Sequence, residues 1–314
     1  MSRAVFLVEH AGPLTTVQDR GRFGYLRYGV TEAGPMDRQA FAIAQAALGN
    51  PPDAAAIETT IGGVALRCVE GAVTVASAGG GFHALLDGRP VGAWAVFTLR
   101  EGSLLTIRPG YWGSWTYLAF AGDIVAPAWL GSRATNVLSD FGGMRLQAGQ
   151  HLEIRDAECR PGRERDLPLP VTSRPRQEIR LVLGPQDRFF APATIRQLLT
   201  EPFTLSNDYD RMGVRLTGPK LPVVGKLDMP SEALPRGSVQ VPGQGDPIVL
   251  LADHQTTGGY PKIAVLASAD QDGFAQLRSR DQVTFRAVTP EGAALAARSR
   301  RSALQQYLAA LGSS

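Results

Sequence analysis

The sequence predicts an all-β fold class, mainly β with a few short helices. Of the 314 residues, 35 are glycine and 22 are proline, and so many chain breakers favour short strands joined by turns. Short apolar runs recur between these breakers, whereas apolar residues at helical spacing occur in only a few stretches. We find no internal repeat, and the pattern favours β-barrels or sandwiches over alternating strands and helices.

Composition and charge narrow the functional classes. The chain is 44% hydrophobic and 19% charged, and its net charge of +3 comes from scattered basic residues, which argues against nucleic acid as a partner. The apolar run at 4–8 stops at Glu9, too early for a signal sequence or a membrane span. Cys68 and Cys159 lie far apart and make no disulfide framework. We therefore expect a cytoplasmic protein that does not bind membranes.

Residues 1–155 are expected to form an N-terminal β lobe. A first strand at 5–8 leads into a polar loop at 12–22, and a helix opens at 34–37, where Asp37 can cap the first turn. Gly49 and Asn50 close that helix, and 52–56 is expected to add one more helical turn. The remaining predicted strands of this lobe, with an Asp-Gly hairpin at 85–91, lie at 73–76, 93–99, 104–108, 115–121 and 152–154.

Three further segments complete the predicted organisation. Residues 156–178 are rich in Pro and Arg without periodicity, which is typical of a linker or long exposed loop. Residues 179–288 are expected to form a C-terminal β lobe that begins with a strand at 179–183. Thr289, Pro290 and Glu291 begin a C-terminal helix over 289–314, with a break expected near Ser299.

The stretch with the greatest variety of functional side chains is residues 248–263, I-V-L-L-A-D-H-Q-T-T-G-G-Y-P-K-I. An apolar strand is followed by a carboxylate, an imidazole, an amide, hydroxyls, two glycines, a phenol and a cation. Only three lysines occur in the chain, at 220, 226 and 262, and Lys262 lies in this stretch. The residue types fit a site for chemistry or for an anion, and they equally fit a solvated hairpin loop.

Several chemistries are unsupported by the sequence. The four histidines show no metal-ligand spacing, so we expect no metal site. Gly79–Gly81 is not followed by Gly-Lys-Ser/Thr, which argues against a Walker-type phosphate loop. No Gly-x-Ser-x-Gly elbow and no Gly-x-Gly-x-x-Gly helix start occurs. The remaining amides, carboxylates, hydroxyls and arginines suit binding and polarising an amide or carboxylate.

A set of motifs identifies a resemblance that covers residues 5–288. The chain resembles the allophanate hydrolase subunit 2 family, which includes the C subunit of 5-oxoprolinase and the KipA-type proteins. The motifs are G-P-L-T-T-V-Q-D-R-G-R, E-T-T-I-G-G, G-S-R-A-T, G-P-Q-D, D-R-M-G-V-R-L, G-S-V-Q-V-P and D-H-Q-T-T-G-G-Y-P-K-I.

The resemblance implies an architecture of cyclophilin-like β-barrels in two lobes and an obligate partner, the subunit 1 protein (the KipI-like B subunit). Three activities follow from it. The first is the C subunit of an ATP-dependent 5-oxoprolinase, which works with the B subunit and a lactam-utilisation type A subunit on a small lactam. The second is the carboxyltransferase half of a biotin-dependent urea or amide carboxylase. The third is a KipA-like antagonist that binds a kinase inhibitor. ATP is expected on the complex rather than on this chain alone, and biotin only under the second activity.

Matching positions carry the family's site onto three polar clusters. Asp253, Lys262 and Asp19 are the expected catalytic residues, with a carboxylate handling a proton. Arg211 or Arg215 is expected to hold a carboxylate or phosphoryl group with Lys262. The alternative for both arginines is structural pairing with Asp208 or Asp210. The substrate-binding set implied by the resemblance is Gln18, Arg22, Arg211, Arg215, Gln240, Gln255, Thr256, Thr257, Gly258, Gly259 and Tyr260.

Overall fold

The computed structural model describes residues 2–224 and 229–312, so Lys226 lies outside the described residues. The chain divides into two compact units. The N-terminal unit contains Met1–Arg22, Ala33–Arg174 and Leu304–Ser314, and the C-terminal unit contains Phe23–Glu32 and Pro175–Ala303. Each unit is built from more than one segment of the chain.

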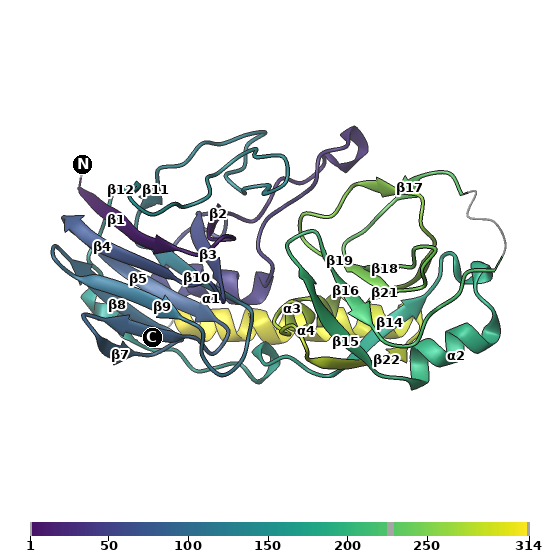
Figure 1. Ribbon diagram of the computed structural model, residues 1–314. Helices are drawn as coiled ribbons and strands as arrows, with labels where there is room; N and C mark the ends of the chain where they lie inside the picture. The colour runs from purple at the N-terminus through teal and green to yellow at the C-terminus, as the bar shows by residue number, and fades with distance from the viewer. Residues whose placement is uncertain (1, 225–228, 313–314) are drawn as a thin grey trace. The chain divides into compact units, whose positions relative to one another are not determined.

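Two antiparallel sheets make up the N-terminal unit (Figure 1). In the described part of the chain, the first has seven strands in the order β11-β12-β1-β4-β9-β6-β7. They are β1 (Arg3–Ala11), β4 (Val64–Glu70), β6 (His83–Leu86), β7 (Arg89–Val91), β9 (Leu104–Arg108), β11 (Asp123–Ile124) and β12 (His151–Arg155). The second runs β13-β8-β5-β10-β3-β2. It contains β2 (Thr16–Gln18), β3 (Ala56–Thr60), β5 (Ala72–Gly79), β8 (Ala95–Arg100), β10 (Trp115–Phe120) and β13 (Arg165–Asp166).

Alternating burial explains why these segments are strands. In β1, Ala4, Phe6 and Val8 are buried while their neighbours face outward, the period-two pattern of a half-buried strand. At the tip of the β6–β7 hairpin, Asp87 and Gly88 both have positive φ, 51° and 76°, as an Asp-Gly turn requires. The predicted hairpin is therefore confirmed.

Helix α1 (Arg38–Leu48) packs on β5 and β10 (Figure 1). Its ends match the prediction: Asp37 Oδ1 accepts a hydrogen bond from the Ala40 N–H at 2.9 Å, and Gly49 adopts the left-handed C-cap with φ of 72°. The last residues of α4 (Pro290–Gly312) also belong to this unit, because Leu304, Tyr307 and Leu308 pack against its core.

A closed barrel forms the C-terminal unit, in the order β14-β21-β18-β19-β16-β15-β22. Its strands are β14 (Glu178–Leu183), β15 (Phe203–Tyr209), β16 (Gly213–Thr217), β18 (Ser238–Gln240), β19 (Ile248–Leu250), β21 (Lys262–Leu266) and β22 (Gln282–Ala287). The barrel closes by parallel pairing of β14 with β22. A separate two-residue ladder joins β17 (Glu232–Ala233) to β20 (Thr257–Gly258). The mainly β class is confirmed.

Shorter elements complete the C-terminal unit and the connections. The helices are α2 (Pro192–Thr200) and α3 (Ser268–Ala275). The 3-10 turns are η1 (Leu26–Tyr28), η2 (Pro161–Arg163), η3 (Val171–Ser173) and η4 (Asp187–Phe189). Within the described residues, no helix combines the length and apolar character needed to cross a membrane.

The structure differs from the expected local structure at four places. The helical turn expected at 52–56 is wrong: an Ala54 N–H to Pro51 C=O turn leads directly into β3, because Ala56 pairs with Ala119 of β10. Helix α3 was missed, since Gly273 and two aspartates hide its weak apolar face. Helix α4 runs through Ser299 without a break. The predicted linker at 156–178 carries the short strand β13, paired with β8.

Candidate functional site

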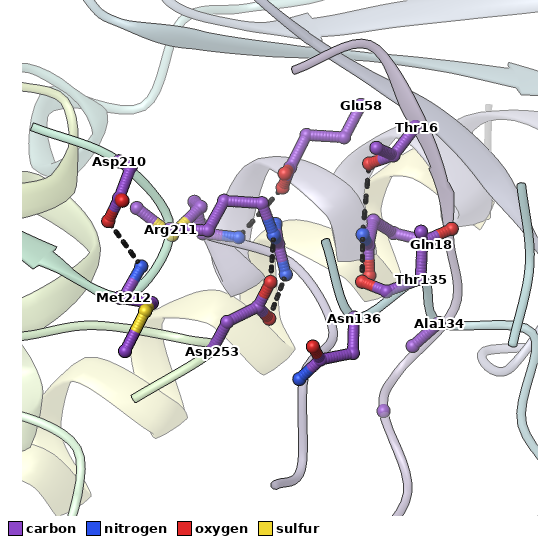
Figure 2. Close-up of polar contacts among 12 residues, drawn as sticks. Thr16, Gln18, Glu58, Ala134, Thr135, Asn136, Asp210, Arg211, Met212 and Asp253 are labelled. Atoms are coloured by element: carbon purple, nitrogen blue, oxygen red, sulfur yellow. Dashed lines mark hydrogen bonds and ion pairs between the residues drawn. The ribbon is translucent and has the colours of Figure 1, made fainter. Parts of the chain in front are cut away.

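The turn between β15 and β16 places Arg211. Asp210 Oδ1 accepts a hydrogen bond from the Met212 N–H at 2.7 Å (Figure 2). It also accepts one from the Gly213 N–H at 3.1 Å. Aspartate suits this position because its short carboxylate reaches main-chain groups two or three residues on. A Cβ on Gly213 would lie 2.8 Å from the Val249 carbonyl oxygen, so close strand packing requires glycine there. The D-R-M-G motif therefore encodes its own turn geometry.

Arg211 forms a buried bidentate ion pair with Asp253. Arg211 Nε and Nη2 each donate to an Asp253 oxygen at 2.9 Å, and both side chains are 1% exposed (Figure 2). The Asp253 N–H also donates to the Arg211 carbonyl at 2.8 Å. Arg211 thus has a structural ion-pair partner in Asp253, a residue outside the two aspartates expected from the sequence. Catalysis by Asp253 stays a prediction, and both its oxygens face the guanidinium.

A cavity of about 360 Å³ opens at the barrel wall beside this turn. Four predicted substrate-binding residues, Arg215, Gln240, Gln255 and Tyr260, line it together. Two carboxylates and an apolar surface complete the lining, and these further residues are Asp208, Asp210, Met212, Gly213, Ile248 and Leu250. The cavity combines an apolar wall with amide, phenol and charged groups, which is the usual make-up of a small-molecule site.

Two glutamine amides form a hydrogen-bond chain in the cavity. Gln255 Nε2 donates to Gln240 Oε1 at 3.3 Å, and Gln240 Nε2 donates to the Tyr260 carbonyl at 3.3 Å. Gln240 is 2% exposed, so its amide is held by the barrel. These two hydrogen bonds orient both side-chain amides and leave Gln255 Oε1 as an acceptor at the cavity.

Arg215 is the cation of the cavity. Its Nε lies 3.7 Å from Asp208 Oδ2, with the two side chains 38% and 80% exposed. The ion pair expected as the alternative role of this arginine is therefore present, but water screens so exposed a pair and leaves it weak. An anionic ligand group can consequently compete with Asp208 for the guanidinium.

Lys262 does not line the cavity. Its side chain is 4% exposed, and Nζ donates to the Ala233 carbonyl at 3.0 Å and lies 3.4 Å from Glu232 Oε2. The Lys262 N–H donates to Gln186 Oε1 at 2.8 Å. The ammonium thus faces β17, and a direct role on an anionic ligand stays a prediction.

The Thr-Thr-Gly-Gly segment follows Gln255 and forms β20. Thr257 and Gly258 lie opposite Ala233 and Glu232 in the ladder with β17, so the Gly258 main chain takes part in strand pairing. A Cβ on Gly258 would lie 2.9 Å from Leu234 Cδ1 and 3.0 Å from Gln240 Nε2, which explains the glycine by packing. Thr256 is half-buried, and Gly259 precedes the exposed Tyr260 ring. Substrate binding by these residues stays a prediction.

His254 was passed over as a site residue on sequence grounds. It is buried, and burial lowers the pKa of its imidazole from the usual 6.5, more than the hydrogen bond to Gln255 raises it. Nδ1 lies 2.7 Å from the Gln255 carbonyl oxygen. Because a carbonyl only accepts, Nδ1 carries the proton and Nε2 keeps its lone pair. His254 is a neutral ring that fixes the main chain at Gln255.

The remaining predicted cluster belongs to the N-terminal unit, where Asp19 ties two loops together. Asp19 Oδ1 accepts hydrogen bonds from the Gly21 N–H at 2.9 Å and Ser132 Oγ at 2.7 Å. Asp19 Oδ2 accepts from the Arg133 N–H at 2.6 Å. It also lines a cavity of about 510 Å³ with Arg133 and Arg160. Its carboxylate is engaged as a loop organiser, and a proton-transfer role stays a prediction.

Gln18 and Arg22 are buried beside the same loop. Gln18 Nε2 donates to Thr16 Oγ1 at 2.9 Å and to the Thr135 carbonyl at 3.0 Å (Figure 2). Arg22 Nη2 donates to the Ala134 carbonyl, and its guanidinium lies 5.3 Å from the Trp129 ring centroid. Both side chains therefore fasten the G-S-R-A-T segment, so the two motifs share a structural function.

Sequence reasoning missed Gln186 and Glu232 as neighbours of the site. Gln186 belongs to the G-P-Q-D motif, and that motif was the available signal in the sequence. Glu232 stands in an irregular segment, and nothing in the sequence linked it to Lys262. Across residues 2–224 and 229–312, no group of acidic, His and Cys side chains converges as a metal site would need.

Comparison with known proteins identifies the family. The sequence model of the protein family described as carboxyltransferase domain, subdomain A and B, matches residues 28–287. The chain is 35% identical to the 5-oxoprolinase C subunit of Haemophilus influenzae over 289 residues, covering 89% of this chain and 90% of that protein. It is 34% identical to the Escherichia coli protein of the same name over 278 residues, covering 88% of each.

A solved structure gives the same result. The Kluyveromyces lactis urea carboxylase superposes with a TM-score of 0.86 at 25% identity. The match covers 98% of this chain and 29% of the urea carboxylase chain. The chain belongs to the carboxyltransferase domain family, subdomains A and B.

Proposed function

We propose that this chain is the C subunit of an ATP-dependent 5-oxoprolinase, which converts 5-oxo-L-proline, ATP and water to L-glutamate, ADP and phosphate. The observation that carries the proposal is sequence identity: the chain is 35% identical to the Haemophilus influenzae C subunit over 89% of its residues. Identity to the urea amidolyase of Lachancea kluyveri is lower, 31% over 89% of this chain. The partners in the reaction are the A and B subunits, and the complex works in the cytoplasm.

The barrel cavity suits a small lactam acid. Its volume of about 360 Å³ accommodates a five-membered ring with one carboxylate. Arg215 binds the carboxylate, while the Gln255 amide hydrogen-bonds the lactam amide. Ile248 and Leu250 pack against the ring methylenes. Tyr260 lies at the mouth, 47% exposed, where its phenol can close over the ligand. Each role follows from the group's chemistry and its place in the lining.

ATP binds elsewhere in the complex under this proposal. The chain carries no phosphate-binding Gly-Lys-Ser/Thr loop, and the cavity presents two aspartates, which disfavour a triphosphate. This chain therefore supplies lactam binding, and phosphoryl chemistry comes from its partners.

An exposed apolar cluster fits contact with the B subunit. In the N-terminal unit, Leu130, Leu138 and Phe141 are 39%, 69% and 50% exposed, and Phe141 stacks on Trp129 at 4.8 Å. Large side chains gathered on one surface loop are typical of a protein interface. We propose this cluster as part of the interface with the B subunit.

The test is turnover by the assembled enzyme. This chain would be co-expressed with its B subunit, the A subunit would be added, and glutamate would be followed from 5-oxoproline with and without ATP. We expect ATP-dependent glutamate that is lost when this chain is omitted. Arg215→Met should raise KM by about ten- to a hundredfold, since a charged hydrogen bond contributes about 1.5–3 kcal/mol. The exposed Arg286→Met on the same unit serves as the control and should leave KM unchanged.

A biotin-dependent carboxyltransferase is the second candidate, favoured by the urea carboxylase match over 98% of this chain. Avidin separates the two, because it blocks a biotin-dependent reaction and leaves the oxoprolinase unaffected. A folded complex without glutamate formation but with avidin-sensitive urea carboxylation would replace the first proposal with the second. A complex without either turnover would indicate a KipA-like binding role.

A further inference from the structure

The strap formed by residues 231–234 and 255–260 carries two of the cavity's polar groups, Gln255 and Tyr260. Its own regular structure is the two-residue ladder between β17 and β20, extended by the Leu234 N–H to Thr256 carbonyl hydrogen bond at 3.0 Å. Such a short ladder is weak in isolation. Side-chain contacts to the barrel must therefore hold the strap in position.

Three buried or half-buried polar groups meet beneath the strap. Gln186 Nε2 donates to Glu232 Oε2 at 2.6 Å, and Gln186 Oε1 accepts from the Lys262 N–H at 2.8 Å. Lys262 Nζ donates to the Ala233 carbonyl at 3.0 Å and lies 3.4 Å from Glu232 Oε2. The orientation of the Gln186 amide is unambiguous, because a carboxylate only accepts and a main-chain N–H only donates.

We propose that Gln186 and Glu232 are positioning residues that, together with Lys262, clamp the strap to the barrel and so set Gln255 and Tyr260 for ligand binding. The proposal rests on the proposed function for the identity of the ligand. Gln186 and Lys262 belong to the barrel unit's buried framework, 1% and 3% exposed, while Glu232 belongs to the strap. The clamp thus joins a fixed element to the element that carries the ligand contacts.

The chemistry of the contact permits an isosteric swap. Gln186→Glu replaces a donor by an oxygen and brings two carboxylates together where a 2.6 Å hydrogen bond stood. Glu232→Gln removes the charge opposite Lys262, while its amide oxygen can still accept the hydrogen bond from Gln186 Nε2. The double variant Gln186→Glu with Glu232→Gln restores one carboxylate and one amide in reversed order, with the same net charge.

The experiment measures all three variants in the assembled complex, with Glu178→Gln, an exposed residue of β14, as the matched control. Gln186→Glu should raise KM for 5-oxoproline about tenfold with a smaller effect on kcat, since a broken hydrogen bond costs about 1–3 kcal/mol. Glu232→Gln, which keeps an acceptor oxygen and loses only its charge, should raise KM less. The double variant should return to within about threefold of the wild-type KM, as expected for two directly coupled residues. Rescue by the swap distinguishes positioning from a general loss of stability.

Hydrogen–deuterium exchange of peptides covering 229–234 and 255–260 provides a readout independent of turnover. Exchange should be faster in each single variant, and near the wild-type rate in the double variant and in Glu178→Gln. Single variants with unchanged exchange, or a double variant no better than the worse single variant, would overturn the clamp. A wild-type complex without ATP-dependent glutamate would overturn the proposed function instead, and exchange would still decide the clamp. If Gln186→Glu does not fold, Glu232→Ala, which removes the acceptor at the half-exposed partner, decides the outcome alone.

Discussion

Replacing Arg211 by methionine should destabilise the barrel unit strongly. The change removes two 2.9 Å hydrogen bonds and the positive charge that Arg211 places against the Asp253 carboxylate, whose side chain is 1% exposed. Removing one partner of a buried ion pair costs about 3–5 kcal/mol, because the remaining charge is still desolvated while the attraction of its partner is lost. Urea denaturation followed by circular dichroism measures the loss as a lower midpoint at constant slope.

Arg286→Met is the matched control for this prediction. Arg286 Nε also lies 2.9 Å from its carboxylate partner, Glu178 Oε1, but these side chains are 55% and 61% exposed. Exposed pairs of this kind contribute about 0.2–1 kcal/mol. The two variants share the substitution and the hydrogen-bond length and differ in burial. If Arg211→Met lost no more stability than Arg286→Met, the reasoning that burial makes the Arg211–Asp253 pair structural would be refuted.

Three further predictions concern stability. Burial lowers the pKa of His254 below 6.5, so the unfolded chain binds the proton first as pH falls. The free energy of unfolding therefore decreases below about pH 6.5, by at most about 1.4 kcal/mol per pH unit. His254→Asn should reduce this dependence of the unfolding free energy on pH, measured by urea denaturation at several pH values, and an unchanged dependence would contradict the prediction. Gly88→Ala, with open space around it, should cost about 1 kcal/mol, whereas Gly71→Ala at the same φ should cost several times more in thermal unfolding because its Cβ would lie 2.1 Å from the Arg3 carbonyl oxygen. Asp19→Asn should lower stability by about 1–3 kcal/mol through lost loop hydrogen bonds; an unchanged melting temperature with lost turnover would instead favour its catalytic role.

Much of the local structure could be read from the chain. The cap at Asp37, the C-cap at Gly49 and the hairpin at Asp87 and Gly88 depend on contacts within a few residues, and the residue types themselves select the geometry. The alternation in β1 indicated a half-buried strand for a similar reason. Helix α3 was not predicted, because tertiary packing rather than its own sequence stabilises it.

The candidate site was only partly accessible in this way. Gln240, Gln255 and Tyr260 were identified as site residues, and the structure brings them to one cavity with Arg215. The loop contained the right groups, but the sequence did not show which of them face a ligand. Lys262, predicted as a catalytic cation, is buried beneath the strap against Glu232, and its catalytic role stays a prediction.

By itself, the sequence determined the mainly β class, the family motifs, and the caps and turns that make short segments fold as they do. The tertiary structure decided which polar side chains are paired inside the protein. Arg211 forms an ion pair with Asp253, and Gln186 hydrogen-bonds to both Glu232 and the Lys262 main chain. The reason is range. A cap or turn closes a ring of a few residues, whereas these contacts join positions 30 to 76 residues apart. Barrel closure and strand register bring such positions together, and neither can be predicted from the sequence of a single segment.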